Sequence, residues 1–486
     1  MVRPQAATQS PTGRAARIFV EESSMTYQTV NPATGQVVET FAAISDRDLD
    51  QALATAHRAF ETDWRRRSVA DRAKVMAKAA AILRERIEEY TGILVLEVGK
   101  RAMEAQAEVD LAAGILEYYA ERAEGFLKPK PVADVPNAEV HIDPIGVLLA
   151  IEPWNFPYYQ VARVVGPQLM AGNTVLLKHA ESVPQSALAF ARLFEEAGAP
   201  DGVYTNIFAT IDQVGRLIDD PRVRGVTLTG SERAGSSVAE RAGRNLKKAV
   251  LELGGSDPLI VLEDAPLEWA IGSAMVGRLF NCGQCCVASK RIIVVGKERG
   301  QAFLDGFSQA MASLKAGDPA DGETGIGPLS SERQLNLLVD QIHRAKDGGA
   351  RVVVGGHRID RAGFFLEPTV LTGLTPENPV YREELFGPVA QFFVVEDEAE
   401  AIRLANDTAY GLGASVFTAD TARGARIAAQ IDSGMVFVNR PFGTTPQLPF
   451  GGAKNSGFGR ELSEAGIEEF VNKKLVHVDP VGTAPF

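Results

Sequence analysis

Short apolar segments that alternate with amphipathic stretches are the feature that most constrains the fold of this chain. A short apolar run between amphipathic stretches is typical of a buried strand, and strands that alternate with helices form a parallel sheet with both faces covered. The pattern therefore predicts an α/β fold. The expected strands lie at 174–178, 203–208, 225–230, 258–263, 291–295, 350–356, 391–397, 415–420 and 434–439.

Helices are expected before this alternation begins. From Ser45 to about Glu124, apolar residues recur at three- and four-residue spacing, and Ser45 or Asp46 is a suitable N-cap. Prolines then break the helical pattern, and residues 138–142 (AEVHI) and 146–151 (GVLLAI) predict a β-hairpin. Because 486 residues exceed the usual size of one core, we expect two or three domains.

The N-terminal stretch differs from the rest of the chain. Residues 1–24 are polar and rich in small side chains, and they lack the apolar centre of a secretory signal. Glu21 and Glu22 argue against a transit peptide, in which acidic residues are scarce. We expect a disordered tail over 1–24, or a natural start at Met25.

Charge and composition exclude several classes of partner. The net charge of −12 leaves no basic excess for binding nucleic acid or an anionic membrane surface. No apolar run approaches the roughly 18 to 20 residues that span a bilayer. Three clustered cysteines do not make a disulfide framework, so the cytoplasm is the expected compartment.

All three cysteines lie in NCGQCC, residues 281–286. A zinc site needs three or four ligands, and neither a second CxxC nor an HxxxH accompanies Cys282 and Cys285, so we expect no metal. Free cysteine is commonly a small buried hydrophobe, which competes with the interpretation that one of the three is a nucleophile. A disulfide from Cys282 to Cys285 or Cys286 is sterically possible. A disulfide between Cys285 and Cys286 is disfavoured, because the Cα atoms of adjacent residues lie about 3.8 Å apart, which is below the usual range for a disulfide.

A nucleophile would need an oxyanion donor and a base, and the sequence offers both. Asn155 follows an expected strand in EPWNFP and has an amide that could donate to an oxyanion, or it is an ordinary turn residue. Glu252 ends the apolar segment of VLELGG, where burial would raise its pKa towards that of a general base, or it is a surface acid. In VTLTGSERAG the GxxxxG spacing of Gly230 and Gly235 could cradle a pyrophosphate, or it is an ordinary βα turn.

Together these stretches resemble the NAD(P)-dependent aldehyde dehydrogenase superfamily, and bacterial succinate-semialdehyde dehydrogenases in particular. The resemblance covers the chain from about Thr26 to His477. It is carried by PWNFP, GNTVLLKHAE, LTGSERAG, LELGGSDP, FNCGQCCVA, EELFGP and PFGGAKNSGFGRE, which occur in the order and at the spacing of the family.

The resemblance implies a division of the chain into domains. An aldehyde dehydrogenase-like α/β fold would have two Rossmann-type domains plus a small β element that mediates oligomerisation. The expected ranges are 25–125 and 147–254 for the NAD-binding domain, 255–463 for the catalytic domain, and 126–146 with 464–486 for the oligomerisation element. A homodimer or homotetramer is expected.

The resemblance also implies roles for individual residues. Cys286 would be the nucleophile, with Asn155 and the Cys286 backbone N–H as the oxyanion hole and Glu252 as the base that activates water. Attack by the thiolate on an aldehyde, loss of hydride to the nicotinamide and hydrolysis of the thioester would give the acid. The expected cofactor-binding residues are Trp154, Lys178, Glu181, Thr229, Gly230, Ser231, Gly235, Leu253, Glu384 and Phe386.

The choice between the two cofactors depends on Glu181. A carboxylate that binds the ribose hydroxyls would repel a 2′-phosphate, so NAD is the expected cofactor and NADP is possible. Glu252 also favours hydrolysis over transfer to CoA, since a CoA-acylating relative needs no such base.

The expected substrate is succinate semialdehyde. Arg163 matches a position that binds the substrate carboxylate in the enzymes resembled, or it is a solvated helix arginine. Thr444 stands where a small hydroxyl is expected. Phe280 departs from the pattern, because some of these enzymes have arginine there, and it favours an aromatic or medium-chain aldehyde as the alternative. Arg440 is a possible replacement.

Two further classes of function compete with the dehydrogenase. A thiol esterase or acyltransferase would use the cysteine without the hydride step. A catalytically dead relative is disfavoured, because Cys286, Glu252 and Asn155 are all present.

Overall fold

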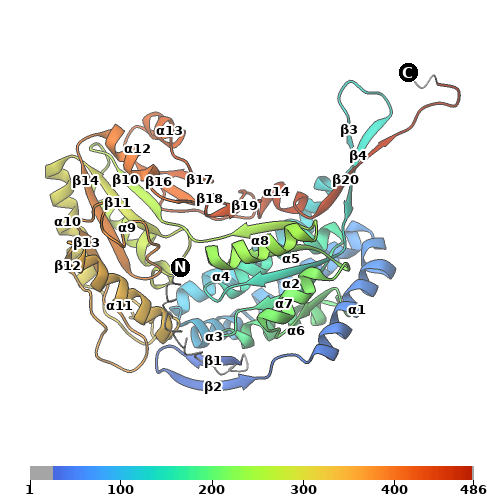
Figure 1. Cartoon of the computed structure of the whole chain (residues 1–486), viewed down its shortest axis with the longest axis horizontal. Helices are drawn as coiled ribbons and strands as arrows, with labels where there is room; N and C mark the ends of the chain where they lie inside the picture. The colour runs from blue at the N-terminus through green and yellow to red at the C-terminus, as the bar shows by residue number, and fades with distance from the viewer. Residues whose placement is uncertain (1–25, 484–486) are drawn as a thin grey trace, which may run out of the picture.

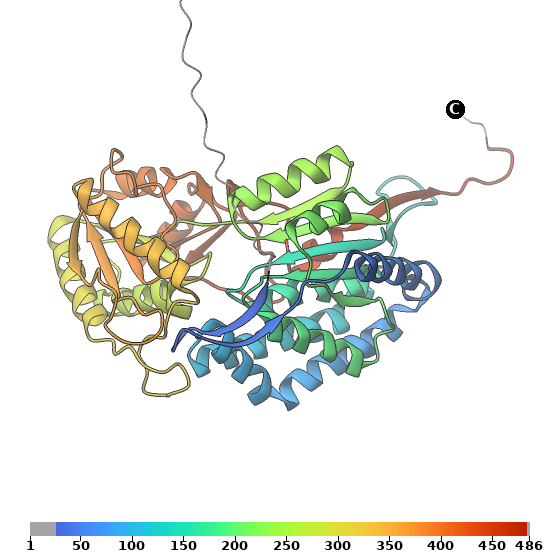
Figure 2. The same ribbon diagram turned by 60° about the horizontal axis from the view of Figure 1, so that its bottom comes forward.

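The computed structural model describes residues 26–483, so the expected tail at 1–24 lies outside the described residues. A small antiparallel ribbon opens the chain, with β1 (Tyr27–Asn31) paired to β2 (Gln36–Phe41). Two large sheets follow, and each forms its own lobe (Figures 1 and 2). This arrangement confirms the α/β expectation.

The first sheet has six strands in the order β19-β9-β8-β5-β6-β7. The five strands from β9 to β7 run parallel to one another, whereas β19 is antiparallel to β9. The order reverses at β5, because β6 and β7 extend to one side and β8 and β9 to the other. The strands are β5 (Val147–Glu152), β6 (Thr174–His179), β7 (Tyr204–Asn206), β8 (Val223–Thr229), β9 (Lys248–Glu252) and β19 (Gly457–Phe458).

Helices cover both faces of this sheet. Along β5, Leu148 and Ala150 pack into one core while Val147 and Leu149 pack into another, as the two-residue period of a strand requires. Ser45 caps the first helix by accepting a hydrogen bond from the Asp48 N–H, which confirms the expected cap. The helices are α1 (Asp46–Thr62), α2 (Val69–Glu85), α3 (Ile87–Val98), α4 (Ala102–Phe126), α5 (Pro157–Ala171), α6 (Pro184–Ala197), α7 (Ile211–Asp219) and α8 (Glu232–Arg244).

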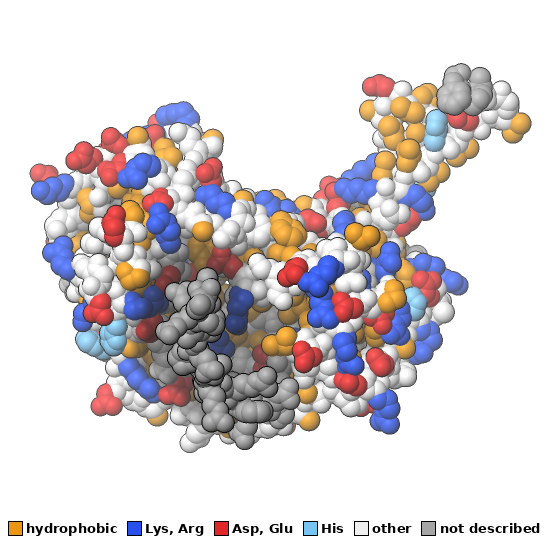
Figure 3. Space-filling model, in the orientation of Figure 1, with side chains coloured by type: hydrophobic (Ala, Val, Ile, Leu, Met, Phe, Trp, Pro, Cys, Tyr) orange, Lys and Arg blue, Asp and Glu red, His pale blue; other side chains and the backbone are white. Residues whose placement is uncertain are grey.

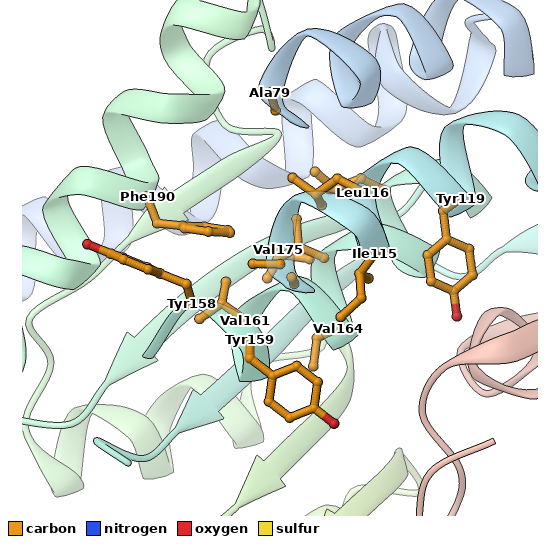
Figure 4. Close-up of a cluster of buried hydrophobic side chains, with 14 of the residues drawn as sticks. Ala79, Ile115, Leu116, Tyr119, Tyr158, Tyr159, Val161, Val164, Val175 and Phe190 are labelled. Atoms are coloured by element: carbon orange, nitrogen blue, oxygen red, sulfur yellow. The ribbon is translucent and has the colours of Figure 1, made fainter. Parts of the chain in front are cut away.

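Neighbouring tyrosines of α5 illustrate how this core is built (Figure 4). The Tyr158 ring stacks on Phe190 of α6, with ring centroids 5.7 Å apart. Tyr159 points away from that pair and meets Phe450 instead. Consecutive residues of α5 therefore have different surroundings: Tyr158 packs into the core, and Tyr159 faces the region of Cys286.

The second sheet has seven strands in the order β12-β13-β14-β11-β10-β16-β17, and only β12 is antiparallel. The strands are β10 (Asp257–Val261), β11 (Ser289–Val295), β12 (Arg351–Val354), β13 (Thr369–Thr372), β14 (Val389–Val395), β16 (Gly413–Phe417) and β17 (Met435–Val438). Its helices are α9 (Leu267–Leu279), α10 (Lys297–Ala312), α11 (Glu332–Asp347), α12 (Glu398–Asn406) and α13 (Thr421–Ala428). A short pair, β15 (Tyr410–Gly411) with β18 (Ala453–Lys454), lies beside it.

A third sheet projects from the body as an arm (Figure 1). It has the order β20-β4-β3, with β3 (Lys130–Pro131), β4 (Ala138–Pro144) and β20 (Val471–His477), and α14 (Ser463–Glu468) leads into it. The hairpin expected from 138–142 and 146–151 is wrong. β4 pairs with β20 in the arm, while β5 pairs with β6 and β8 in the first sheet.

Candidate active site

A cavity of about 380 Å³ opens where the two lobes meet, and it brings together most of the residues singled out in the sequence. Asn155 follows β5, Thr229 ends β8 and Glu252 ends β9, so the cavity lies at the carboxyl ends of the strands where the sheet order reverses. Ligands of open α/β sheets bind at such a position. Its lining includes Trp154, Asn155, Thr229, Gly230, Ser231, Glu252, Leu253, Cys286, Glu384 and Phe386.

The loop before β11 separates the three cysteines. Cys286 lines the cavity and is partly exposed, while Cys282 and Cys285 are buried. Cys282 packs into the core of the second lobe and Cys285 into that of the first. All three are free thiols in this structure, and the disulfide to Cys286 stays a prediction.

A sharp turn aims this loop at the cavity. Asn281 and Cys282 both have φ of 54°, and Gly283 has 73°. A left-handed conformation is costly for residues with a Cβ, and the Asn281 side chain offsets part of that cost by donating to the Asn155 carbonyl at 2.9 Å. The same contact ties the turn to the strand end that carries the expected oxyanion donor.

Asn155 is buried and already oriented. Its Nδ2 donates to the Gln284 carbonyl at 3.1 Å. A side-chain amide nitrogen has two N–H donors, so the second is left for the cavity that Asn155 lines.

Glu252 is 2 % exposed, and neither carboxylate oxygen has a hydrogen-bond partner within residues 26–483. Burial raises its pKa, and the nearby Glu461 carboxylate raises it further, whereas the Arg163 guanidinium acts in the opposite direction. A carboxylate without donors and with a raised pKa has the properties of a general base.

The thiols are also electrostatically tuned. The hydrogen bond with Cys286 lowers the pKa of Cys285 to about 7, against the effect of burial and with the help of the Lys290 charge. The same hydrogen bond, together with burial, raises the pKa of Cys286, whereas the Arg163 and Lys290 charges act in the opposite direction. A thiolate, not a thiol, is the reactive form.

Most of the expected cofactor residues line the cavity, namely Trp154, Thr229, Gly230, Ser231, Leu253, Glu384 and Phe386. Ser231 caps α8 by accepting a hydrogen bond from the Ala234 N–H at 3.3 Å, so the N-terminus of α8 faces the cavity beside Gly230. A Cβ on Gly235 would come within 2.7 Å of the Leu253 side chain, so the glycine permits close packing of the helix there. The Trp154 and Phe386 rings meet edge to face, with centroids 5.8 Å apart.

Lys178 and Glu181 lie at the end of β6 and are ion-paired. Lys178 is 7 % exposed, and its Nζ lies 5.6 Å from the centre of the Tyr27 ring. Neither residue lines the cavity of about 380 Å³. They could hold the distant end of a dinucleotide, whose nearer end would reach Glu384.

The residues expected to bind the substrate converge on Tyr159. The Arg163 guanidinium lies 3.4 Å from the Tyr159 hydroxyl, and the Thr444 side chain also hydrogen-bonds to Tyr159. Phe280 stacks on Phe156 at 6.0 Å, and Phe156 in turn meets Tyr159 at 6.1 Å.

Arg163 is neither solvated nor free. It is 1 % exposed, its Nε lies 2.6 Å from Glu461 Oε2, and one amino group donates to the Thr229 hydroxyl at 3.2 Å. The interpretation as a solvated helix arginine is therefore wrong, and a substrate carboxylate would have to share the guanidinium with Glu461.

Comparisons with known proteins identify the family. The sequence profile described as the aldehyde dehydrogenase family matches residues 19–476. The chain belongs to the aldehyde dehydrogenase family. This confirms the family, the fold and the aldehyde dehydrogenase activity that the sequence motifs implied, with NAD(P) as the acceptor.

Individual relatives of this aldehyde dehydrogenase are similar over nearly their whole length. A succinate-semialdehyde dehydrogenase [NADP(+)] of Deinococcus radiodurans is 49% identical over 461 residues, which cover 94% of this chain and 96% of the relative. The crystal structure of succinic semialdehyde dehydrogenase from Streptococcus pyogenes in complex with NADP+ is 44% identical and has a TM-score of 0.92, covering 93% of this chain and 100% of that one. The NAD-dependent aldehyde dehydrogenase from Sinorhizobium meliloti is 36% identical with a TM-score of 0.91, covering 95% and 93%.

Sequence reasoning missed three residues of this aldehyde dehydrogenase that contact expected site residues. Tyr159 joins Arg163 to Thr444, Glu461 pairs with Arg163, and Lys290 contacts the loop of Cys286. Lys290 stands at the start of a strand, where a lysine is usually solvated, so nothing in the sequence marked it.

No metal was expected, and residues 26–483 contain no group of three or more His, Cys, Asp or Glu side chains that could hold a metal ion. Within the same residues, no helix is long and apolar enough to cross a membrane.

Proposed function

We propose that this aldehyde dehydrogenase oxidises succinate semialdehyde to succinate. The observation that carries the proposal is the convergence of Cys286, Asn155 and Glu252 on one cavity, with Arg163 beside it. The names of the relatives from Deinococcus radiodurans and Streptococcus pyogenes support the same substrate.

The residues of the cavity fit a nicotinamide dinucleotide. The N-terminus of α8 beside Gly230 suits a pyrophosphate, and Glu384 offers a carboxylate to ribose hydroxyls. Trp154, Phe386 and Leu253 supply apolar lining. When bound, the nicotinamide supplies the acceptor for the hydride that leaves the aldehyde carbon.

The protein's own side chains perform the remaining steps. The Cys286 thiolate attacks the carbonyl carbon, and the Asn155 amide and the Cys286 backbone N–H stabilise the oxyanion that forms. Loss of hydride leaves an acyl thioester on Cys286. Glu252 then takes a proton from water, the resulting hydroxide attacks the thioester, and the Cys286 thiolate leaves as the acid is released.

For the cofactor we propose NAD over NADP. The Glu181 carboxylate would lie at the adenosine ribose, where it would repel a 2′-phosphate. Its ion pair with Lys178 offsets part of that repulsion, and the relatives named above include enzymes of both cofactors. Kinetics with both cofactors tests the proposal. We expect a higher kcat/KM with NAD, and Glu181→Gln should shift the ratio towards NADP at least about tenfold; a wild-type preference for NADP would show it to be wrong.

An aldehyde panel tests the substrate. We expect succinate semialdehyde to give the highest kcat/KM in an assay of absorbance at 340 nm. One observation favours a second candidate, since Phe280 packs between Phe156 and Phe442 in an aromatic cluster. A higher kcat/KM for benzaldehyde or hexanal would establish that second candidate. Thioester hydrolysis without any change at 340 nm would instead favour an esterase.

We also propose a homo-oligomer in a reducing compartment such as the cytoplasm. The supporting features are the exposed edge of β20 in the arm and the three free thiols.

A further inference from the structure

A buried lysine that the mechanism does not use connects the nucleophile to the cofactor site. Lys290 is the second residue of β11 and is 1 % exposed. Its Nζ donates to the Cys285 carbonyl at 2.9 Å and to the Cys286 carbonyl at 2.6 Å, and it lies 3.1 Å from Glu384 Oε1. Two N–H groups of the ammonium therefore donate to these carbonyls, and its charge pairs with the Glu384 carboxylate.

The contacts of Lys290 extend to the strand that carries the base. Glu384 Oε1 also accepts a hydrogen bond from the Gly255 N–H at 3.0 Å. Gly255 lies three residues after Glu252, and a Cβ there would come within 2.6 Å of the Cys286 carbonyl oxygen. The segments of the nucleophile, the base and Glu384 therefore meet around one ammonium group.

The Lys290 ammonium contacts two kinds of partner. Buried ammonium groups are retained where they are paired and hydrogen-bonded, and here the partners are two carbonyls next to the thiols and one carboxylate that is 19 % exposed and lines the cavity. The Phe386 ring, which also lines the cavity, lies with its centre 5.8 Å from Nζ. Packing alone would not require a cation at this point.

We propose that Lys290 is a positioning residue that fixes the loop of Cys286 relative to Glu384 and stabilises the thiolate of Cys286. The proposal rests on the proposed function, in which Glu384 holds the nicotinamide ribose. Removal of the ammonium would release both partners, so it would affect cofactor affinity and thiol reactivity together.

Other groups also face the Cys286 thiol, and they stay in place when Lys290 is replaced. Cys285 is adjacent, Tyr159 and Arg163 face it from α5, and Glu252 faces the same cavity from β9. Asp257 is also near Lys290: burial raises its pKa to about 7, and the Lys290 charge acts in the opposite direction.

Lys290→Met keeps the length of the side chain and removes its charge and donors. The rate at which iodoacetamide alkylates Cys286, read on the Cys286 peptide by mass spectrometry, should fall at least about fivefold at pH 7, and its pH midpoint should rise by about one unit. The KM for NAD should increase and kcat/KM for the aldehyde should fall at least about tenfold. Lys74→Met, at an exposed lysine of α2, is the control that should change neither quantity.

A double-variant comparison with Glu384→Gln tests the coupling. If Lys290 acts through Glu384, the fold-loss of NAD affinity in the double variant should be clearly smaller than the product of the fold-losses in the two single variants. An unchanged alkylation profile, or losses that multiply, would overturn the proposal. If Lys290→Met does not fold, Lys290→Gln removes the charge while keeping an N–H donor, and the same outcomes decide. Alkylation needs no substrate, so this measurement remains valid even if wild-type enzyme fails to oxidise succinate semialdehyde.

Discussion

Glu252 combines burial with a shortage of donors, and this combination sets the pH dependence expected for the enzyme. Burial and the charge of Glu461 raise its pKa, and a general base acts only in its ionised form. We therefore expect kcat to rise with pH through that raised pKa and to be lost as the pH falls below it. A pH profile of kcat in the hydrolysis step measures this, and a flat profile from pH 5 to 8 would contradict it.

Glu252→Gln separates the two halves of the reaction. The amide cannot take a proton from water, so kcat should fall about 10² to 10⁴-fold, the usual contribution of a general base. A single pre-steady-state burst at 340 nm should persist, because attack by the thiolate does not need the water. Loss of the burst together with kcat would mean that Glu252 also deprotonates Cys286.

The junction between α4 and α5 contains a fully buried ion pair. The Lys100 ammonium contacts the Glu108 carboxylate, and both side chains are 0% exposed. Glu108 Oε1 also accepts hydrogen bonds from the Tyr158 and Tyr159 N–H groups at 2.9 and 3.2 Å. A carboxylate at the first turn of α5 complements the helix dipole, and it fixes the helix that begins two residues after Asn155.

Lys100→Met should lower the free energy of unfolding by about 3–5 kcal/mol, because it leaves the buried Glu108 carboxylate without its opposite charge. Urea denaturation measures the loss. The control is the double variant Lys100→Met/Glu108→Gln, in which the amide oxygen can still accept from α5 and no charge is stranded. The double variant should recover part of the loss, and a double variant less stable than Lys100→Met would contradict this account.

The elements that the sequence predicted well are those defined by their own residues. The apolar runs 174–178 and 225–230 correspond to β6 and β8. They could be predicted because a strand buried on both faces must be apolar throughout. The hairpin failed because β4 and β5 are neighbours in the chain but belong to different sheets. β4 pairs instead with β3 and with β20, which lies more than 300 residues later, and no local pattern encodes the pairing with β20.

The candidate site divides in the same way. Cys286, Asn155 and Glu252 could be found because each stands in a motif of the family. The residues around them could not, because their roles depend on what faces them in the fold. The sequence left two interpretations of Arg163, a residue that binds the substrate carboxylate or a solvated surface residue. Its ion pair with Glu461 joins α5 to a residue 298 positions later.

At the scale of the whole molecule, the site belongs to neither lobe alone. Asn155 and Glu252 come from the first sheet, while Cys286 and Glu384 come from the second lobe. Gly254 and Gly255, between β9 and β10, carry the chain from one sheet to the other. A substitution that shifts the lobes would therefore change the distance between base and nucleophile.

Among the residues that the structure describes, the outer edge of the arm pairs with no other strand. β20 is the edge strand of its sheet, and Leu475 and Val478 are 63% and 64% exposed; hydrophobic side chains gather on the arm in Figure 3. The unpaired backbone N–H and C=O groups of an edge strand are a template for pairing with a second chain. Leu475→Glu should therefore reduce the mass measured by light scattering after size exclusion towards that of one chain. Leu246→Glu, at a leucine that is 94% exposed outside the arm, is the matched control and should leave the mass unchanged. A wild-type enzyme that already elutes as a single chain would show that the arm does not mediate assembly.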